Sequence, residues 1–127
     1  MRYFIYGSGA VGGTIGARLH LAGREVTLIA RGSHFEAIRE KGLSFIDPEG
    51  EHNLQIPVIE IPKKDEISAG DVFILCMKSQ DTQEALDVLS SVTGPETPIV
   101  CAQNGVNNER IAIRYFKNVY GMLVVLP

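Results

Sequence analysis

The amino-acid sequence predicts an α/β fold, a doubly wound parallel sheet with helices on both faces. Short apolar runs alternate with stretches of helical periodicity along the chain. The run from Val72 to Met77 has no polar interruption, as expected for a central parallel strand that is covered on both faces. The first apolar run breaks into glycines between Gly7 and Gly12 before a helical pattern resumes. These three observations define the fold class.

The segment from Arg2 to Gly12 predicts a strand, a phosphate-binding loop and the start of a helix. Gly7 permits a tight turn after the strand, Gly9 lets the backbone approach a pyrophosphate, and Gly12 lets the helix pack closely on the sheet. The free N–H groups of the helix would face the phosphates. Taken alone the spacing is weakly informative, because the chain contains 13 glycines.

The residues that follow favour a dinucleotide-binding βαβ unit over a purely structural glycine turn. Ile15 and Leu19 follow Val11 with helical spacing. Gly23 occupies the position expected after a helix end, and a second buried strand is expected at 26–29. The predicted architecture is therefore Rossmann-like. The residues expected to bind the cofactor phosphates are Gly7, Ser8, Gly9, Ala10, Val11 and Gly12.

A second helix is expected from Ser33 to about Lys41. Ser33 and Glu36 have the spacing of a capping box, in which each side chain accepts a backbone N–H of the first turn. Gly42 follows directly and is a typical residue for a helix end. This helix would follow the second strand of the sheet.

A small hairpin insertion is expected after this helix. Strands at 43–46 and 54–58 flank the segment 47–50, which has Pro at its second position and Gly at its fourth, as in a β-turn. Pro57 and Pro62 confine the segment to the edge of a sheet, because proline cannot donate to a strand ladder.

The rest of the chain continues the alternation. Strands are expected at 71–77, 98–102 and 119–126, one helical turn at 63–67, and helices that start within 79–82 and at about 107 and end before Gly94 and at about 116.

In such a sheet the ligand binds outside the carboxyl ends of the strands. The features expected at these ends are the glycine loop, Arg31 after the second strand, Lys78 after the strand at 71–77, and Asn104 after the strand at 98–102. All of them are polar or suited to phosphate, so we expect them at one site.

Arg31 predicts a preference for NADP(H). An NAD-binding domain usually has Asp or Glu about 20 residues past the glycines, where it accepts hydrogen bonds from the ribose hydroxyls. Arg31 stands at that place here. A guanidinium can bind a 2′-phosphate through two charge-assisted hydrogen bonds, whereas a carboxylate would repel it. The alternative is an arginine that only solvates a loop.

Lys78 and Asn104 have two interpretations each. Lys78 could reach a phosphate or the nicotinamide ribose, or it could be a solvated lysine at a strand end. Asn104 could hydrogen-bond the nicotinamide end or a substrate oxygen, or it could serve only as a turn former before Gly105. The spacing does not decide between them.

Composition limits the partners. The chain of 127 residues suits one domain, and its formal net charge of −3 argues against a nucleic-acid partner. No apolar run approaches the roughly 20 residues of a membrane span, and the first strand leaves no room for a signal peptide, so we expect a cytoplasmic protein without a membrane partner. Cys76 and Cys101 are expected as buried reduced thiols. No metal site is expected, because His20, His34 and His52 share no evident site.

The chain resembles the N-terminal domain of the ketopantoate reductase (2-dehydropantoate 2-reductase) family along essentially its whole length. The resemblance rests on the ordered combination of four segments, at 7–12, 30–43, 77–80 and 103–106. It implies NADPH-dependent reduction of the ketone of 2-dehydropantoate, a small keto acid, to pantoate on the way to pantothenate and coenzyme A. It also implies that Arg31 meets the 2′-phosphate and that Lys78 and Asn104 lie near the reaction centre.

The resemblance also implies a missing part. Members of the family continue into a helical C-terminal substrate domain that supplies the general-acid lysine, and this chain stops at Pro127. We therefore expect residues 1–127 to form an NADP(H)-binding domain without a catalytic residue of its own, which is inactive in isolation. The apolar strand that includes 122–126 needs cover, which a second copy of the chain in a homo-oligomer or the missing domain would supply.

Two other functions stay open. A non-catalytic dinucleotide-sensing regulatory module uses the same fold, but such modules usually carry an acidic residue where this chain has Arg31. Another NADP-dependent oxidoreductase acting on a different 2-keto acid or alcohol would share this cofactor domain, because substrate choice lies mostly in the other domain.

Overall fold

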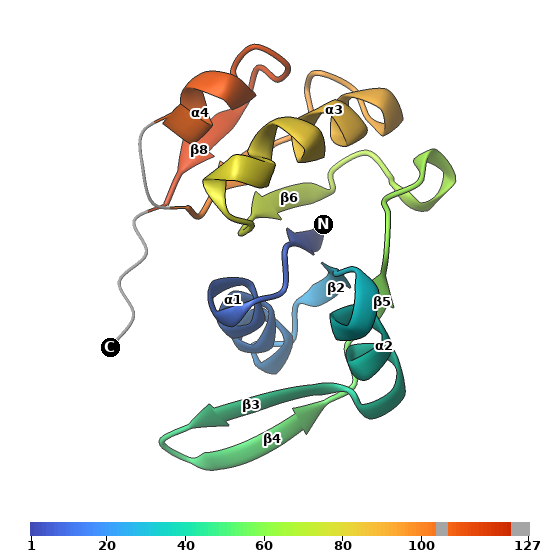
Figure 1. Ribbon diagram of the computed structural model, residues 1–127, viewed down its shortest axis with the longest axis vertical. Coiled ribbons are helices and arrows are strands. Elements are labelled where there is room, and N and C mark those ends of the chain that lie inside the picture. The colour runs from blue at the N-terminus through green and yellow to red at the C-terminus, as the bar shows by residue number, and fades with distance from the viewer. Residues whose placement is uncertain (104–106, 123–127) are drawn as a thin grey trace.

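The computed structural model describes residues 1–103 and 107–122 of the chain. Strands and helices alternate as the sequence predicts, and Figure 1 shows their arrangement. The elements are β1 (Arg2–Tyr6), α1 (Ala10–Leu21), β2 (Glu25–Ile29), α2 (Gly32–Lys41), β3 (Leu43–Asp47), β4 (Gly50–Leu54), β5 (Val58–Ile59), η1 (Lys64–Glu66), β6 (Val72–Leu75), η2 (Ser79–Asp81), α3 (Thr82–Val92), β7 (Ile99–Cys101), α4 (Asn107–Ala112) and β8 (Val119–Gly121).

Six parallel strands form the main sheet in the order β5-β2-β1-β6-β7-β8. The chain winds outward from β1 in one direction and then from β6 in the other, which is the order of a Rossmann-like doubly wound sheet. β3 and β4 pair separately as an antiparallel hairpin, which projects at one end of the molecule (Figure 1). The predicted fold class and its hairpin insertion are confirmed.

The core has two layers because successive residues of each strand point to opposite faces of the sheet. Ile5 and Ile74 belong to the layer under α1, α2 and the hairpin, whereas Phe4 and Phe73 belong to the layer under α3 and α4. The rings of Phe4 and Phe73 stack on neighbouring strands with centroids 4.8 Å apart. All four residues of β6 are buried, which confirms the prediction of a strand covered on both faces.

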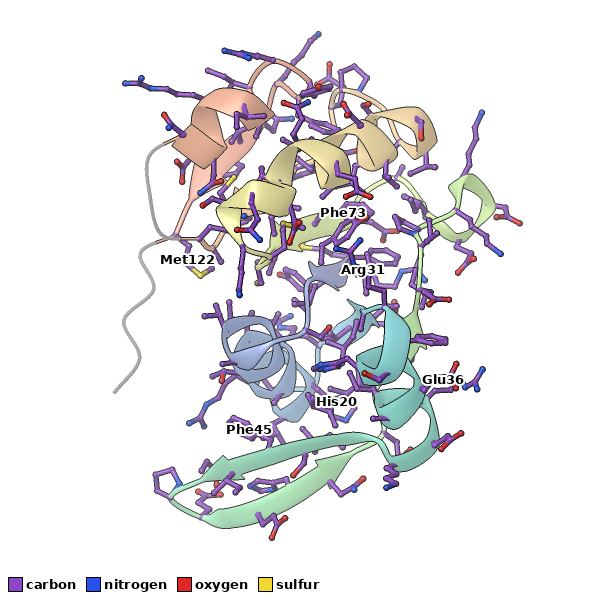
Figure 2. All side chains as sticks on the ribbon, viewed as in Figure 1. His20, Arg31, Glu36, Phe45, Phe73 and Met122 are labelled. Carbon is purple, nitrogen blue, oxygen red and sulfur yellow. The ribbon has the colours of Figure 1, made fainter. Side chains whose placement is uncertain are left out.

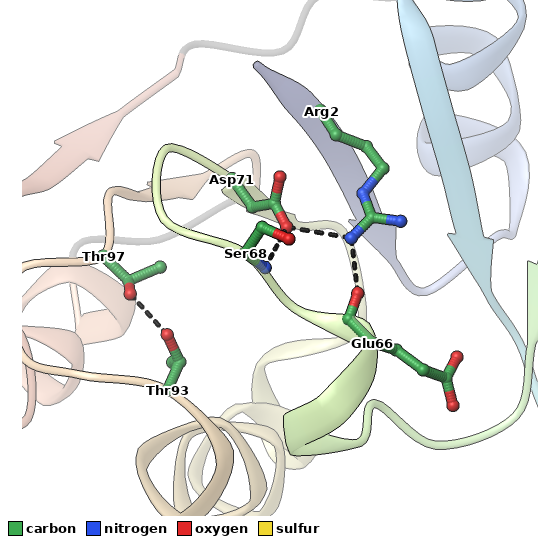
Figure 3. Close-up of polar contacts among 6 residues, drawn as sticks. All are labelled: Arg2, Glu66, Ser68, Asp71, Thr93 and Thr97. Atoms are coloured by element: carbon green, nitrogen blue, oxygen red, sulfur yellow. Dashed lines mark hydrogen bonds and ion pairs between the residues drawn. The ribbon is translucent and has the colours of Figure 1, made fainter.

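A polar cluster ties the start of β1 to the segment before β6 (Figure 3). Arg2 donates from Nη2 to the Asp71 carboxylate at 3.0 Å and to the backbone carbonyl of Glu66. Asp71 also accepts the Ser68 N–H at 2.8 Å and is only 5% exposed. The amino ends of β1 and β6 are thereby held together, so that the two strands also end side by side. The hydroxyls of Thr93 and Thr97 close the loop after α3 (Figure 3).

The predicted capping box at the start of α2 is wrong. The helix begins at Gly32, with Arg31 as its N-cap residue and without a side-chain capping bond from it. The N–H of Gly32 instead donates to the Glu60 side chain at 3.4 Å. A carboxylate from another part of the chain therefore accepts the N–H of the first helical residue.

The returning strand of the hairpin lies earlier than predicted. Asp47 pairs with Gly50, and its carboxylate accepts the N–H groups of Glu49 and Gly50 at 2.9 and 3.1 Å. Strand pairing therefore resumes directly after the turn and ends at Leu54, where we expected it to start. The apolar residues of β5 leave the hairpin and pair with β2 at the edge of the main sheet.

Helix α4 is shorter than predicted, and the strand predicted at 119–126 falls within the described residues only as far as Met122. The turn after α4 tightens, with the N–H groups of Tyr115 and Phe116 both donating to the carbonyl of Ala112, so the helix does not reach residue 116. β8 ends at Gly121, although the N–H of Met122 still donates to the carbonyl of Cys101 at 2.9 Å. Residues 123–127 lie outside the described part, so the oligomer expected through 122–126 stays a prediction. No helix in the described ranges is long and apolar enough to cross a membrane.

Candidate cofactor-binding cleft

A cleft of about 620 Å³ lies at the carboxyl ends of β1, β2 and β6. The chain leaves β1 toward α1 on one face of the sheet and leaves β6 toward α3 on the other, so these neighbouring strands form the switch point of the topology. The cleft is bounded by the glycine loop, the ends of β2 and β5, and the first turns after β6. The residues on which the following argument depends are Tyr6, Gly9, Arg31, Glu60, Lys78 and Glu84.

The three glycines of the loop differ in what surrounds them. Gly7 has a φ of +96°, and a Cβ there would lie 2.7 Å from the backbone N of Met77. A Cβ on Gly12 would lie 1.9 Å from the carbonyl oxygen of Gly7. A Cβ on Gly9 would have no atom of the described chain within 4 Å. Packing within the chain therefore requires Gly7 and Gly12, whereas Gly9 leaves open space beside the backbone.

The loop is fixed to the end of β2. The Gly7 N–H donates to the carbonyl of Ile29 at 3.1 Å, and the Ser8 hydroxyl donates to the same carbonyl at 3.3 Å. Ser8 is only 6% exposed, and its hydrogen bond holds the loop against the end of β2. The first turn of α1, with Ala10 and Val11, then follows the loop directly.

The amino end of α1 is suited to an anion. Its N-cap residue is Gly9, which has no side chain to accept the first N–H groups, and the first turn contains no acidic residue. The first N–H groups of a helix have no partner within the helix, and the helix dipole places partial positive charge there. A phosphate in the cleft would complete these hydrogen bonds.

Arg31 extends into the same cleft from the end of β2. Its guanidinium Nη1 lies 3.9 Å from Oε1 of Glu84 in the first turn of α3, and both side chains are about 70% exposed. Figure 2 shows Arg31 between α2 and α3. Because these helices cover opposite faces of the sheet, the ion pair spans the cleft.

Two groups that line the cleft stay protonated at neutral pH. Burial raises the pKa of Tyr6, the negative charge of Glu84 raises it further, and Arg31 acts in the opposite direction. Burial raises the pKa of the Cys76 thiol to about 12. The cleft therefore offers no thiolate nucleophile at Cys76.

Lys78 lies where the main cleft meets a second hollow of about 290 Å³. It is exposed, three residues beyond the end of β6, and is the N-cap residue of the short helix η2. Gln103 lines the second hollow and donates from Nε2 to the carbonyl of Met77 and to the Thr82 hydroxyl, each at 2.8 Å. These bonds fix the end of β7 against the start of α3. Asn104 itself lies outside the described residues.

The structure thus brings the glycine loop, Arg31 and Lys78 to one cleft, and it adds two residues that the sequence analysis missed. Glu84 could have been found, because the helix expected after Lys78 must start at the same edge of the sheet. The sequence gives no sign that Glu60 lies at the cleft, because the pattern predicts a hairpin strand at 54–58 and so does not place the residues after it at the edge of the main sheet. His34 lines the cleft, and no three His, Cys, Asp or Glu side chains within 1–103 and 107–122 gather in a way that could hold a metal ion.

The family model and the curated relatives that match this chain carry the same description, that of a ketopantoate (2-dehydropantoate) reductase. The sequence model of the family "Ketopantoate reductase PanE/ApbA" matches residues 3–126. A 2-dehydropantoate 2-reductase of Mesorhizobium japonicum is 39% identical over 107 residues, which cover 84% of this chain and 32% of that protein. The enzyme of the same name from Pyrococcus horikoshii is 38% identical over 112 residues, covering 86% of this chain and 35% of that protein. The chain thus spans about a third of the length of these curated relatives.

Solved structures show the same fold. A PanE/ApbA family ketopantoate reductase from Ralstonia eutropha superposes with a TM-score of 0.81 at 29% identity, over 95% of this chain and 40% of that one. D-mandelate dehydrogenase in a ternary complex with NADH and anilino(oxo)acetate superposes with a TM-score of 0.79 at 29% identity, with the same coverage.

Proposed function

The chain belongs to the ketopantoate reductase PanE/ApbA family, and from this premise we propose that it is the NADP(H)-binding domain of a 2-dehydropantoate 2-reductase. Relatives that share 38–39% identity with it are named for that reaction. In the proposal, residues 1–127 bind the cofactor. A helical domain, corresponding to the length of the relatives that this chain does not span, binds the keto acid and supplies the general-acid lysine.

One observation carries the cofactor assignment: a single cleft contains the open side of Gly9, the amino end of α1 and Arg31. Gly9 has no packing reason to be glycine, since a Cβ there would meet no described atom. A ligand that approaches the backbone gives a reason. The amino end of α1 suits a pyrophosphate, and Arg31 lies at the far side of the same cleft, where the adenosine ribose would lie.

Arg31 supports NADP(H) over NAD(H). A guanidinium that replaces the acidic residue usual in NAD-binding domains can form charge-assisted hydrogen bonds to a 2′-phosphate. Such bonds contribute about 1.5–3 kcal/mol, which corresponds to about a ten- to hundredfold gain in affinity. The solved D-mandelate dehydrogenase complex holds NADH; in the proposal, Arg31 directs the choice in this chain toward NADP(H).

The reaction needs a hydride and a proton. When bound, the reduced nicotinamide supplies the hydride to the ketone carbon, and an acid protonates the resulting alkoxide to give the alcohol. In this chain the loop from Gly7 to Gly12 and the amino end of α1 hold the pyrophosphate. Lys78 is exposed in the turn after β6, and in the proposal it orients the cofactor toward the reaction centre. Asn104 is proposed for the same region through the family resemblance.

The proposal is tested by titrating the protein with NADPH and with NADH and following nucleotide fluorescence. The wild-type protein should bind NADPH at least about tenfold more tightly, and Arg31→Ala should remove most of that difference. Arg39→Ala is a matched control, because Arg39 is also exposed and ion-paired but interacts with Glu36 on its own helix. Binding of neither nucleotide, or an unchanged preference in Arg31→Ala, would contradict the assignment.

A second candidate is a reductase of another 2-keto acid. The similarity to D-mandelate dehydrogenase, at a TM-score of 0.79 and 29% identity, favours it. Both candidates need the same cofactor domain, so nucleotide titration does not separate them. A panel of 2-keto acids, assayed by NADPH oxidation with a form of the protein that has a substrate domain, does so. Fastest turnover of 2-dehydropantoate would support the first candidate, and fastest turnover of an aromatic keto acid the second.

A further inference from the structure

We propose that Glu84 and Glu60 limit the affinity of the cleft for a 2′-phosphate, Glu84 by competing with the phosphate for Arg31 and Glu60 by placing a negative charge at the amino end of α2, beside Arg31. The inference rests on the proposed cofactor function of this cleft and refines it. It assigns to two carboxylates, distant from Arg31 in the sequence, the role of setting the selectivity between nucleotides with and without a 2′-phosphate.

Glu84 is the direct ionic partner of Arg31. The two charged groups approach to 3.9 Å from opposite sides of the cleft, and both line it. A guanidinium that binds a phosphate through two parallel hydrogen bonds must turn its N–H groups toward the phosphate oxygens. A phosphate that binds through the Nη1 side of Arg31 therefore displaces the Glu84 carboxylate from it.

Glu60 places a second carboxylate next to Arg31. It directly follows β5, and its Oε2 accepts the N–H of Gly32 at 3.4 Å. Gly32 is the neighbour of Arg31 and the first residue of α2. The amino end of a helix favours negative charge, so the Glu60 side chain occupies the position that an incoming anion would also favour.

Tyr6 lines the same cleft as Arg31 and Glu84 and lies within reach of both charges. Its phenol lines the cleft, and its pKa is raised by burial and by the charge of Glu84 and lowered by that of Arg31. The field in this part of the cleft is therefore a balance between Arg31 and the acidic side chain opposite it.

The carboxylates affect two kinds of ligand differently. A phosphate monoester carries about −1.5 to −2 charges at neutral pH, so nearby carboxylates repel it. A ribose 2′-hydroxyl can donate a hydrogen bond to a carboxylate, as in NAD-binding domains. Removing a carboxylate should therefore raise the affinity only for the ligand that carries a 2′-phosphate. Because both groups of the Arg31–Glu84 pair are about 70% exposed, the expected gain is moderate, about two- to fivefold.

The experiment measures the ratio of the dissociation constants of 5′-AMP and 2′,5′-ADP, which isolates the contribution of the 2′-phosphate. Glu84→Gln and Glu60→Gln each remove one charge and keep the side-chain shape, and the amide oxygen at position 60 can still accept the Gly32 N–H. Glu96→Gln is the matched control. Glu96 pairs with Lys117 at 3.1 Å with similar exposure, in the loop before β7 at the opposite end of the strands.

Glu84→Gln and Glu60→Gln should each raise this ratio about two- to fivefold, and Glu96→Gln should leave it unchanged. In the Arg31→Ala background the effect of Glu84→Gln should shrink to the part due to repulsion alone, because no guanidinium remains to compete for. High salt should also reduce the gain. A wild-type protein that prefers 2′,5′-ADP, with an unchanged or lowered ratio in both variants, would overturn this inference alone. Failure of the wild-type protein to bind either nucleotide would overturn the cofactor assignment as well.

Discussion

Replacing Gly12 with alanine should destabilise the protein, although alanine is the better helix former. Gly12 lies within the first turn of α1, where alanine would normally gain about 1 kcal/mol over glycine. Here the added Cβ would lie 1.9 Å from the carbonyl oxygen of Gly7, whereas side-chain carbons almost never approach closer than 3.0 Å. The contact must therefore open by about 1.1 Å, the difference between these two distances.

The surrounding structure cannot yield easily. The atom in the way belongs to the backbone of Gly7, whose N–H is bonded to Ile29 and whose φ of +96° fixes the turn. Overpacking of a well-packed site costs about 1–3 kcal/mol, and a rigid backbone obstacle belongs to the upper part of that range. The net loss should be at least about 1 kcal/mol after the gain in helix propensity, which lowers the melting temperature by about 4 °C or more.

Gly13→Ala is the matched control for thermal and urea unfolding. Gly13 is the next residue of the same helix, and a Cβ there would have its nearest contacts at 3.8 Å, an ordinary packing distance. This variant should be more stable than the wild-type protein by about 0.5–1 kcal/mol. If Gly12→Ala were as stable as Gly13→Ala, the close contact between the glycine loop and α1, and the reasoning based on it, would be refuted.

Three further perturbations test other parts of the structure. Arg2→Met should lower the free energy of unfolding by about 1–3 kcal/mol in urea titrations, because the buried carboxylate of Asp71 would lose the guanidinium 3.0 Å away; unchanged stability would contradict the role of this pair. The hydrogen bond from His52 lowers the pKa of Asp47, so the ionised Asp47 carboxylate stabilises the hairpin above pH 3.8, its ordinary pKa, and this stabilisation is lost as the pH falls through the lowered pKa. Hydrogen exchange of the hairpin amides should show this loss in the wild-type protein, and Asp47→Asn should abolish the pH dependence. Desolvation of the partly buried Cys76 thiol raises its pKa to about 12, so an alkylating reagent at mildly alkaline pH should modify this thiol much more slowly in the native than in the unfolded protein. Equally rapid labelling of the native protein would contradict the raised pKa.

Local sequence patterns predicted the structure correctly where an apolar run could be buried in only one way. The run at Val72–Leu75 became a strand that is buried on both faces, because no other arrangement covers four consecutive apolar residues in a sheet. The glycine loop was also predictable, because its spacing follows from the turn, from the close approach of α1 and from the need for open space at Gly9.

Local sequence patterns gave the wrong structure where two arrangements of the same residues fitted the pattern equally well. The apolar residues of β5 fit a hairpin strand as well as a main-sheet strand, and pairing with β2 decided in favour of the sheet. Ser33 and Glu36 have the correct spacing for a capping box, but α2 starts one residue earlier, at Gly32, whose N–H donates to Glu60. In both cases a contact from a distant part of the chain replaced a local one.

The alternation of strands and helices, the glycine loop and the cationic side chains at Arg31 and Lys78 could be read from the amino-acid sequence, because these features depend on residues that are close together in the chain. Which groups surround Arg31 depends on contacts between distant parts of the chain. The sheet order places the ends of β2 and β5 side by side, and the switch between β1 and β6 turns the first turn of α3 toward the same cleft. The winding of the sheet therefore brings Glu84 to Arg31 and Glu60 to the N–H of the neighbouring Gly32, although these residues are far apart in the sequence.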